Sequence, residues 1–177
     1  MKTLVIHPED ASTDFLKTIY EDIENKTVLS TGLTFEKIAT ELQKDYDLIL
    51  LLGHGWQGGL YDRKQGGTAV TGEHAPYLRG KNVVAVFCNA KDYFEIFNIS
   101  GFATGMFISE PHEAIDYAVV TNKEQINESS TLFARVMKTA VKTPEKIKEV
   151  VDKNYLLENN PVVKINRQFM DIDPWDD

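Results

Sequence analysis

Two uninterrupted aliphatic runs constrain the fold more than any other feature of this sequence. Leu48–Leu52 and Val83–Phe87 are short and contain no polar residue, which is typical of central strands in a parallel sheet buried on both faces. Amphipathic helical patterns separate the apolar runs along the chain, and this alternation indicates successive βαβ units. We therefore expect an α/β protein: a three-layer sandwich around a mostly parallel sheet of about five or six strands.

The remaining elements follow from the same periodicities. Further strands are expected over Thr3–His7, Lys26–Ser30 and Gly105–Ser109, and a small hairpin with arms at Leu60–Tyr61 and Thr68–Val70. Helices are expected to be capped by Ser12 or Thr13, by Thr34 with Phe35 buried, and by Thr143, to begin at Pro111, and to run through Tyr93, Phe94 and Phe97.

Composition narrows the functional classes. The chain has 177 residues, and we expect one domain over residues 1–170 followed by an acidic tail at 171–177. A net charge of −8, with no stripe of lysine and arginine, disfavours nucleic acid as a partner. No apolar run approaches the roughly 18 residues of a membrane helix, and the N-terminus lacks a signal-peptide pattern, so we expect no membrane partner and a cytoplasmic location. The oligomeric state is left open.

The same reasoning bears on cofactors. A single cysteine permits neither an intramolecular disulfide nor a cysteine-based zinc cage. The sequence also lacks the histidine and carboxylate spacings of dedicated metal sites and both common nucleotide fingerprints. We therefore expect no metal and no cofactor.

The two aliphatic runs end on residues with chemical capacity. Gly53, His54 and Gly55 follow the first run, and Cys88 follows the second. Because parallel strands end at one edge of the sheet, the usual place for chemistry in an open α/β fold, we expect the imidazole and the thiol to meet there. His54 lies between two glycines on a loop, where packing gives no reason for an imidazole. A lone cysteine at the end of a strand, in contrast, could equally be a core residue.

An acyl-transfer reaction would use these groups in a defined way. Cys88 is the candidate nucleophile, and His54 the base that forms its thiolate and the acid that protonates the leaving amine. The backbone N–H groups of Gly55 and Cys88 could stabilise the oxyanion, with a glycine at position 55 leaving room for the carbonyl group.

At these residues the sequence resembles a known family. An aliphatic strand ending in His54–Gly55, followed by an aliphatic strand ending in Cys88, is similar to the caspase-like cysteine peptidases, which include clostripain, gingipain, legumain and the bacterial caspase-like domains. The resemblance implies a cysteine endopeptidase, or an inactive relative that kept the fold, with a His54–Cys88 dyad, a peptide or protein substrate and no cofactor. Candidate substrate-binding residues are Trp56, Asn89, Glu110, Asp10, Ser12 and Thr13.

A second interpretation uses the same edge without covalent chemistry. Asp10, Ser12, Thr13, His54 and Trp56 could line a site for a small ligand, with the helix start at Ser12–Thr13 binding an anion such as a phosphate or nucleotide. Asp10 would repel a phosphate unless a divalent metal intervened, and simple helix capping explains Ser12 and Thr13 equally well.

Other polar and aromatic residues are assigned lower priority. We expect His7 to be a satisfied strand end and His74 to lie in a solvated loop. Trp56 is expected either to form an exposed wall for a substrate or to pack under the hairpin.

Overall fold

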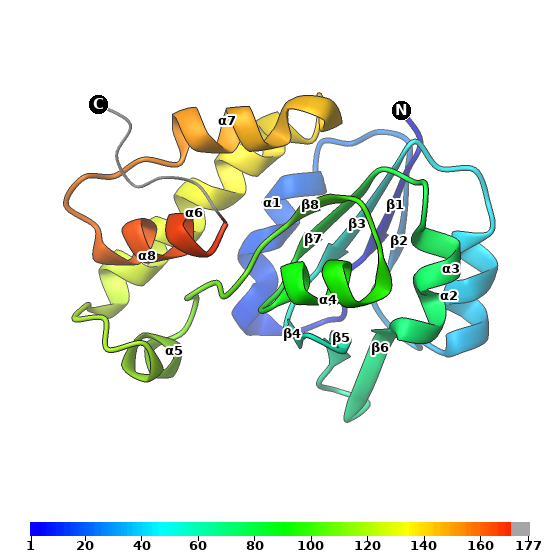
Figure 1. The fold of residues 1–177 in the computed structure, drawn as a ribbon, viewed down its shortest axis with the longest axis horizontal. Helices are drawn as coiled ribbons and strands as arrows, with labels where there is room; N and C mark the ends of the chain where they lie inside the picture. Colours follow the sequence, from blue (N-terminus) through cyan, green and yellow to red (C-terminus); the bar gives the residue numbers. More distant parts are fainter. Residues whose placement is uncertain (171–177) are drawn as a thin grey trace. The chain divides into compact units, whose positions relative to one another are not determined.

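The computed structural model describes residues 1–170 and shows an α/β fold (Figure 1). A parallel sheet has the order β2-β1-β3-β7-β8, and a small antiparallel sheet has the order β4-β5-β6. Their bounds are β1 (Thr3–Ile6), β2 (Lys26–Leu29), β3 (Leu48–Leu52), β7 (Val83–Val86) and β8 (Gly101–Ala103), and β4 (Gly55–Trp56), β5 (Gly59–Asp62) and β6 (Gly67–Thr71). The expected class, with five parallel strands, is confirmed, and the architecture fits a three-layer α/β sandwich.

The helices alternate with the strands in the first part of the chain and follow one another in the second. They are α1 (Lys17–Tyr20), α2 (Phe35–Leu42), α3 (Ala75–Leu78), α4 (Ala90–Phe97), α5 (Pro111–Asp116), α6 (Lys123–Ala140), α7 (Ile147–Asn154) and α8 (Pro161–Phe169), with short 3-10 helices η1 (Ala11–Leu16), η2 (Gly72–His74) and η3 (Pro144–Lys146). Within residues 1–170, none of these helices has the length and apolar character needed to cross a bilayer.

The chain divides into two compact units. The first comprises residues 1–14 and 22–105 and holds both sheets; the second comprises residues 15–21 and the chain from Met106 onward. A single domain over residues 1–170 therefore stays a prediction. The acidic tail expected at 171–177 lies outside the described residues.

The first unit is organised around β1, β3 and β7. Every residue of these strands is buried, as the aliphatic runs predict. Ile6, Leu51 and Ala85 are aligned across the three strands and belong to one core cluster. Ile38 of α2 and Tyr93 of α4 join that cluster, so these helices cover one face of the sheet.

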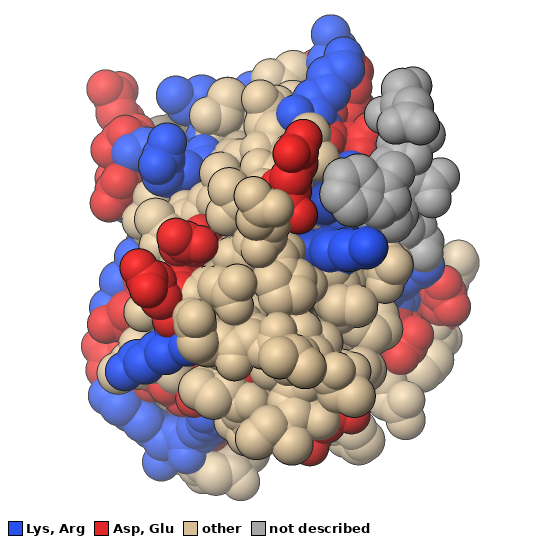
Figure 2. Space-filling model, turned by 90° about the vertical axis from the view of Figure 1, so that its left-hand side faces the viewer, with Lys and Arg blue, Asp and Glu red and all other residues tan. Residues whose placement is uncertain are grey.

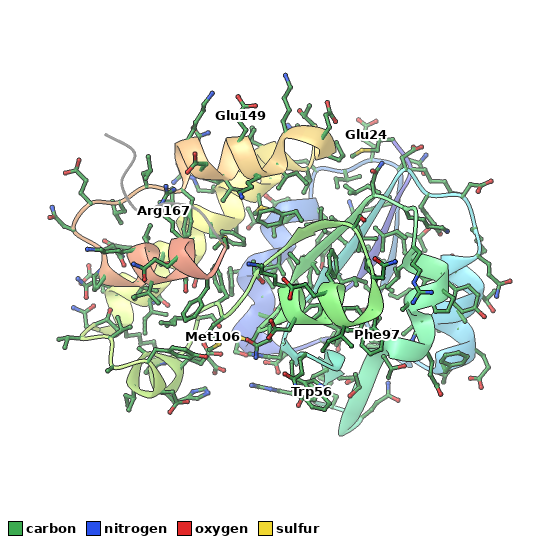
Figure 3. All side chains as sticks on the ribbon, viewed as in Figure 1. Glu24, Trp56, Phe97, Met106, Glu149 and Arg167 are labelled. Carbon is green, nitrogen blue, oxygen red and sulfur yellow. The ribbon has the colours of Figure 1, made fainter. Side chains whose placement is uncertain are left out.

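The second unit is helical and also holds buried polar side chains. Ile108, Ala114, Ile126 and Val162 form an apolar cluster within it. Arg167 extends from α8 and donates to backbone oxygens of α7 and of the residue that follows α7 (Figure 3). On the face shown in Figure 2, acidic and basic side chains surround a largely uncharged area, and no continuous basic stripe crosses it.

The strand expected over Gly105–Ser109 is wrong. The edge strand is instead β8, which pairs in parallel with β7. Gly101 makes this pairing possible because its φ is +144° and a side chain there would overlap the carbonyl of Val83. Ile108 needs no strand, since the side chain of Asn166 hydrogen-bonds both its N–H and its carbonyl oxygen.

Several predicted helix starts need correction. The first helix is not capped by Ser12 or Thr13: η1 follows Asp10, whose carboxylate accepts from the Ser12 N–H. Thr34 does cap α2, as predicted, but Phe35, the first residue of the helix, is 40% exposed and packs its ring against His74. Thr143 precedes η3 without a side-chain cap.

Candidate active site

The candidate site lies where the order of strands reverses. β1 is flanked by β2 on one side and β3 on the other, so the loops that follow β1 and β3 leave the sheet at neighbouring strand ends. In open α/β sheets this switch point is where ligands and catalytic groups are found. Here the segment after β1 carries Asp10 in the loop and Ser12 at the start of η1, and the loop after β3 carries His54.

His54 is held by backbone contacts on both sides. Gly53 has a φ of +140°, a conformation that favours glycine, and its N–H donates to the carbonyl oxygen of Val86 at 3.0 Å. The carbonyl oxygen of His54 accepts from the Tyr61 N–H at 2.8 Å. Because β7 and β5 thus fix the backbone around it, the imidazole, in a residue only 7% exposed, has a defined position.

A chain of short hydrogen bonds joins His54 to the first loop. Ser12 Oγ lies 2.7 Å from His54 Nε2 and 2.7 Å from Asp10 Oδ1. The Ser12 N–H also donates to Asp10 Oδ1, at 3.0 Å. Three residues from the two loops at the switch point therefore form one connected polar cluster, which we call the Asp10–Ser12–His54 chain.

The direction of these bonds follows from the charge on Asp10. Partial burial raises the pKa of this carboxyl, but hydrogen bonds from Ser12 and the positive charges of protonated His54 and of Arg63 outweigh burial and hold the pKa below its ordinary value. Asp10 is therefore ionised at neutral pH and only accepts hydrogen bonds. The single hydroxyl hydrogen of Ser12 goes to Asp10, so His54 Nε2–H donates to Ser12 Oγ.

This polarity argues against Ser12 as a nucleophile. A serine nucleophile gives its hydroxyl hydrogen to the imidazole, whereas here the imidazole donates to the serine oxygen. With Nε2 engaged, Nδ1 is the ring nitrogen through which His54 would accept a proton from a substrate or a thiol. His54 Nε2 also lies 3.8 Å from Asp10 Oδ2, close enough for the carboxylate to stabilise the protonated ring.

A second histidine repeats the pattern in the same loop. His7 Nε2 lies 3.2 Å from Thr13 Oγ1, and Thr13 Oγ1 donates to the carbonyl oxygen of Asp10 at 3.1 Å. By the same argument His7 donates through Nε2. His7 is 2% exposed, so it is a satisfied, buried strand end as expected, and it anchors Thr13 rather than facing a ligand.

Cys88 lies in a rigid turn between β7 and α4. Leu52 and Val86 are partners in the β3–β7 register, so His54 and Cys88 each stand two residues beyond a paired position. Phe87, which is 2% exposed, donates through its N–H to Thr104 Oγ1, and its carbonyl oxygen accepts from the same hydroxyl. Cys88 itself is partly exposed.

Asn89 completes that turn. Its φ of +60° is left-handed, which asparagine tolerates better than most residues, and its N–H donates to the carbonyl oxygen of Gly105. Asn89 is the residue before α4 and makes no side-chain cap. Its backbone role explains the asparagine, while a contact with substrate stays a prediction.

Gly55 has a packing reason to be glycine. A methyl group there would overlap the Phe87 ring and come within 2.7 Å of the Gly59 carbonyl oxygen. The glycine thus lets β4 lie directly on the residue that precedes Cys88. The expected role of the Gly55 N–H toward an oxyanion stays a prediction.

Trp56 forms part of an exposed aromatic pair beside this site. It lies on the small sheet (Figure 3). It is 45% exposed, and its ring is parallel to that of Tyr61 on the neighbouring strand, with centroids 6.4 Å apart. This exposure contradicts packing beneath the hairpin, and a role as a wall for a substrate stays a prediction.

The structure corrects the prediction for His74 and adds one residue, Arg63, that the sequence did not indicate. His74 is 1% exposed, because its Nδ1 accepts from the Thr71 N–H and its ring packs on Phe35; the solvated-loop prediction is wrong. Arg63 was missed: its guanidinium lies 3.6 Å from Asp10 Oδ2. No local sequence pattern signals that contact, because it depends on the β5–β6 hairpin folding back to the β1 loop.

Glu110 belongs to the second unit. It precedes α5, and the Glu113 carboxylate accepts from the backbone N–H groups of Ser109 and Glu110. This arrangement accounts for the acidic residues at the helix start. A contact between Glu110 and a substrate stays a prediction.

Comparison of the whole chain with protein-family models and with curated proteins finds no match.

Proposed function

We propose that the protein is a cysteine-dependent acyl-transfer enzyme that cleaves peptide bonds, similar in chemistry to the caspase-like peptidases. Cys88 is the nucleophile and His54 carries the proton. The observation that carries this proposal is the β3–β7 register, in which both residues follow paired strand positions by the same two-residue step. The imidazole of His54 is also oriented by the Asp10–Ser12–His54 chain.

In each half of the reaction, His54 first accepts a proton and then donates it. His54 Nδ1 accepts the thiol proton as the Cys88 sulfur bonds to the carbonyl carbon of the substrate. The proton then passes from His54 to the amine as the carbon–nitrogen bond breaks, leaving an acyl-enzyme. Water next gives a proton to His54 and attacks the acyl carbon, and the departing sulfur recovers that proton.

The surroundings suit an extended peptide beside the dyad. Trp56 and Tyr61 present exposed aromatic faces on the strands that follow His54. Aromatic faces of this kind supply contact area to a peptide side chain at low cost in conformational entropy.

Alkylation tests the proposal directly because the chain has one cysteine, so any single adduct reports on Cys88. We expect iodoacetamide to modify the native protein rapidly at pH 7, and the variant His54→Ala to react at least tenfold more slowly. A matched control is His112→Ala, an exposed histidine on α5, which should react like the wild type. Modification only after denaturation would contradict the proposal.

Cleavage of a diverse peptide library would extend the test to the substrate. The wild type should generate new peptide termini that share a residue on one side of the cut, and Cys88→Ala should generate none. Equal cleavage by the two proteins would show that the thiol does not carry out the reaction.

A second candidate function is supported by a hollow on the small sheet. It has a volume of about 420 Å³ and is lined by Tyr61, Asp62, Arg63, Gly66, Gly67 and Thr68. The Asp62 carboxylate is engaged by the N–H groups of Lys64 and Gln65, and the Arg63 side chain, which is about half exposed, lies 3.6 Å from Asp10 Oδ2. This arrangement favours a small anionic ligand.

Thermal shift distinguishes this alternative. Inorganic phosphate or AMP should raise the melting temperature of the wild type but not of Arg63→Gln, since a ligand that binds the folded state stabilises it. No shift with either probe, together with a reactive Cys88, would favour the peptidase alone.

A further inference from the structure

The position of Ser12 between a carboxylate and an imidazole has a consequence for His54. Ser12 Oγ contacts Asp10 Oδ1 and His54 Nε2 at the same distance, 2.7 Å, while the direct approach of Asp10 to the ring is longer, at 3.8 Å. The carboxylate therefore reaches the imidazole chiefly through the hydroxyl. The serine is fixed in turn, because its own N–H donates to the same carboxylate oxygen.

We propose that Asp10 and Ser12 are positioning residues that fix the tautomer of His54, holding the hydrogen on Nε2 so that Nδ1 is the nitrogen that takes the Cys88 proton. This inference rests on the proposed function, since it assigns His54 a proton to accept. It replaces the substrate-binding role expected for Asp10 and Ser12 with a role exerted through His54.

The distances also determine how the charge of Asp10 affects the protonation of His54. When Nδ1 accepts a proton the ring becomes positive, and that charge forms 3.8 Å from Asp10 Oδ2 in a residue that is largely buried. An ionised carboxylate at that distance favours the charged ring and therefore the thiolate that accompanies it. Arg63, 3.6 Å from the same oxygen, competes for this carboxylate and limits the effect.

Thr13 provides a matched control within the same loop. Its hydroxyl contacts His7 Nε2 and the carbonyl oxygen of Asp10, which is the same kind of bridge directed at the other histidine. Thr13→Val removes that hydroxyl with little change of shape and leaves the contact between Ser12 and His54 in place. A general effect of loosening the loop would appear in this variant, whereas an effect specific to His54 would not.

The test combines ring nitrogen chemical shifts with alkylation kinetics. The full chain labelled with ¹⁵N-histidine has four histidines, and His54→Ala identifies the signals of His54. In a Cys88→Ala background, where no thiolate keeps the ring protonated, the neutral ring should carry its hydrogen on Nε2. With Ser12→Ala added to this background, the tautomers should become mixed. In Ser12→Ala alone, alkylation of Cys88 by iodoacetamide should slow about fivefold at pH 7 with no change at pH 9, where hydroxide removes the thiol proton.

Asp10→Asn separates charge from geometry. An asparagine oxygen can still accept from Ser12, so the tautomer should be largely retained, while alkylation at pH 7 slows for want of the negative charge. Thr13→Val should match the wild type in both measurements. An unchanged tautomer and unchanged rates in Ser12→Ala would overturn the positioning role.

The two proposals fail in different ways. If Ser12→Ala changes the tautomer but His54→Ala leaves Cys88 alkylation unaffected, then the Asp10–Ser12–His54 chain orients the ring and the proposed dyad is wrong. If His54→Ala slows alkylation while Ser12→Ala and Asp10→Asn do not, the dyad stands and the positioning role is overturned.

Discussion

Two polar clusters in this protein, one partly buried and one fully buried, are built alike and yet suit different tasks. The first is the Asp10–Ser12–His54 chain of the first unit. The second, in the second unit, centres on Asn166, whose amide contacts the backbone of Ile108 and the hydroxyl groups of Ser129 and Tyr155. Both connect segments that are far apart in sequence.

The clusters differ in charge and in access. Asn166 and Ser129 are fully buried and neutral, and burial raises the pKa of Tyr155 to about 12, so no member of that cluster changes its charge near neutral pH. The first cluster holds an ionised carboxylate and a histidine beside a partly exposed thiol turn. A buried polar cluster therefore indicates chemistry when it contains a group that can gain or lose a proton at the working pH, and packing when it does not.

The largest effect on stability is expected from replacing Asn166, the residue on which the neutral cluster centres. Asn166→Leu preserves volume but leaves the buried N–H and carbonyl of Ile108 without their side-chain partner. Because each such group costs about 1–3 kcal/mol, we expect the free energy of unfolding to fall by about 3 kcal/mol in urea titrations. Asn154→Leu, on the exposed end of α7, should change it by less than about 0.5 kcal/mol. Equal effects of the two changes would remove the structural role.

Gly55→Ala tests the close packing of β4 against Phe87. The added methyl group overlaps the Phe87 ring, so we expect a loss of about 2 kcal/mol in unfolding free energy, within the usual range for overpacking. Gly67→Ala is the matched control, since a methyl group there meets no atom within 4 Å and the backbone is unstrained. A Gly55→Ala protein as stable as Gly67→Ala would show that β4 does not press on Phe87 as described.

Ser12→Ala measures how much the Asp10–Ser12–His54 chain contributes to stability. Ser12 is only partly buried, so water can replace its hydroxyl, and the free energy of unfolding should fall by about 1 kcal/mol or less. The ratio of the Asn166→Leu and Ser12→Ala effects, measured in the same urea titrations, should exceed two. A larger loss for Ser12→Ala would mean that the Asp10–Ser12–His54 chain stabilises the fold as much as the neutral cluster does.

The smallest effect concerns pH. Burial lowers the pKa of His74, only partly offset by backbone contacts with Phe35 and Thr71, so the unfolded chain binds a proton more readily than the folded one. Stability should therefore be unaffected by this residue above its ordinary pKa of about 6.5 and should fall as the pH drops below it, by less than about 1 kcal/mol at pH 5.5. His74→Gln should lose this component when unfolding is compared at pH 7.5 and 5.5, and His112→Gln should keep it. A pH response that is the same in both variants would count against the buried, neutral His74.

The sequence predicted the elements whose evidence is local. The aliphatic run at β3 and the cap at Thr34 can each be recognised within a few residues, and the structure confirms both. The edge strand was misplaced because Gly105–Ser109 is as apolar as a strand, and the partner that satisfies Ile108, Asn166, is distant in sequence. Periodicity carries no information about such a partner.

The site was predictable residue by residue but not as a network. Asp10, Ser12 and His54 were each singled out, but their mutual contacts depend on β1 and β3 being neighbours and on where each strand ends. Arg63 joins only through the hairpin, which is why it was missed. Non-local contacts of this kind are fixed by tertiary packing, so a single sequence does not reveal them.

The pH profile of Cys88 alkylation tests most directly whether His54 and Cys88 act together. An ordinary thiol reacts only as the pH approaches about 8.5, whereas a thiolate paired with an imidazolium reacts well below it. The wild type should react at nearly constant rate between pH 7 and 9, and His54→Ala should lose most of that rate at pH 7 while converging with the wild type at pH 9. Superimposable profiles for the two proteins would contradict the account.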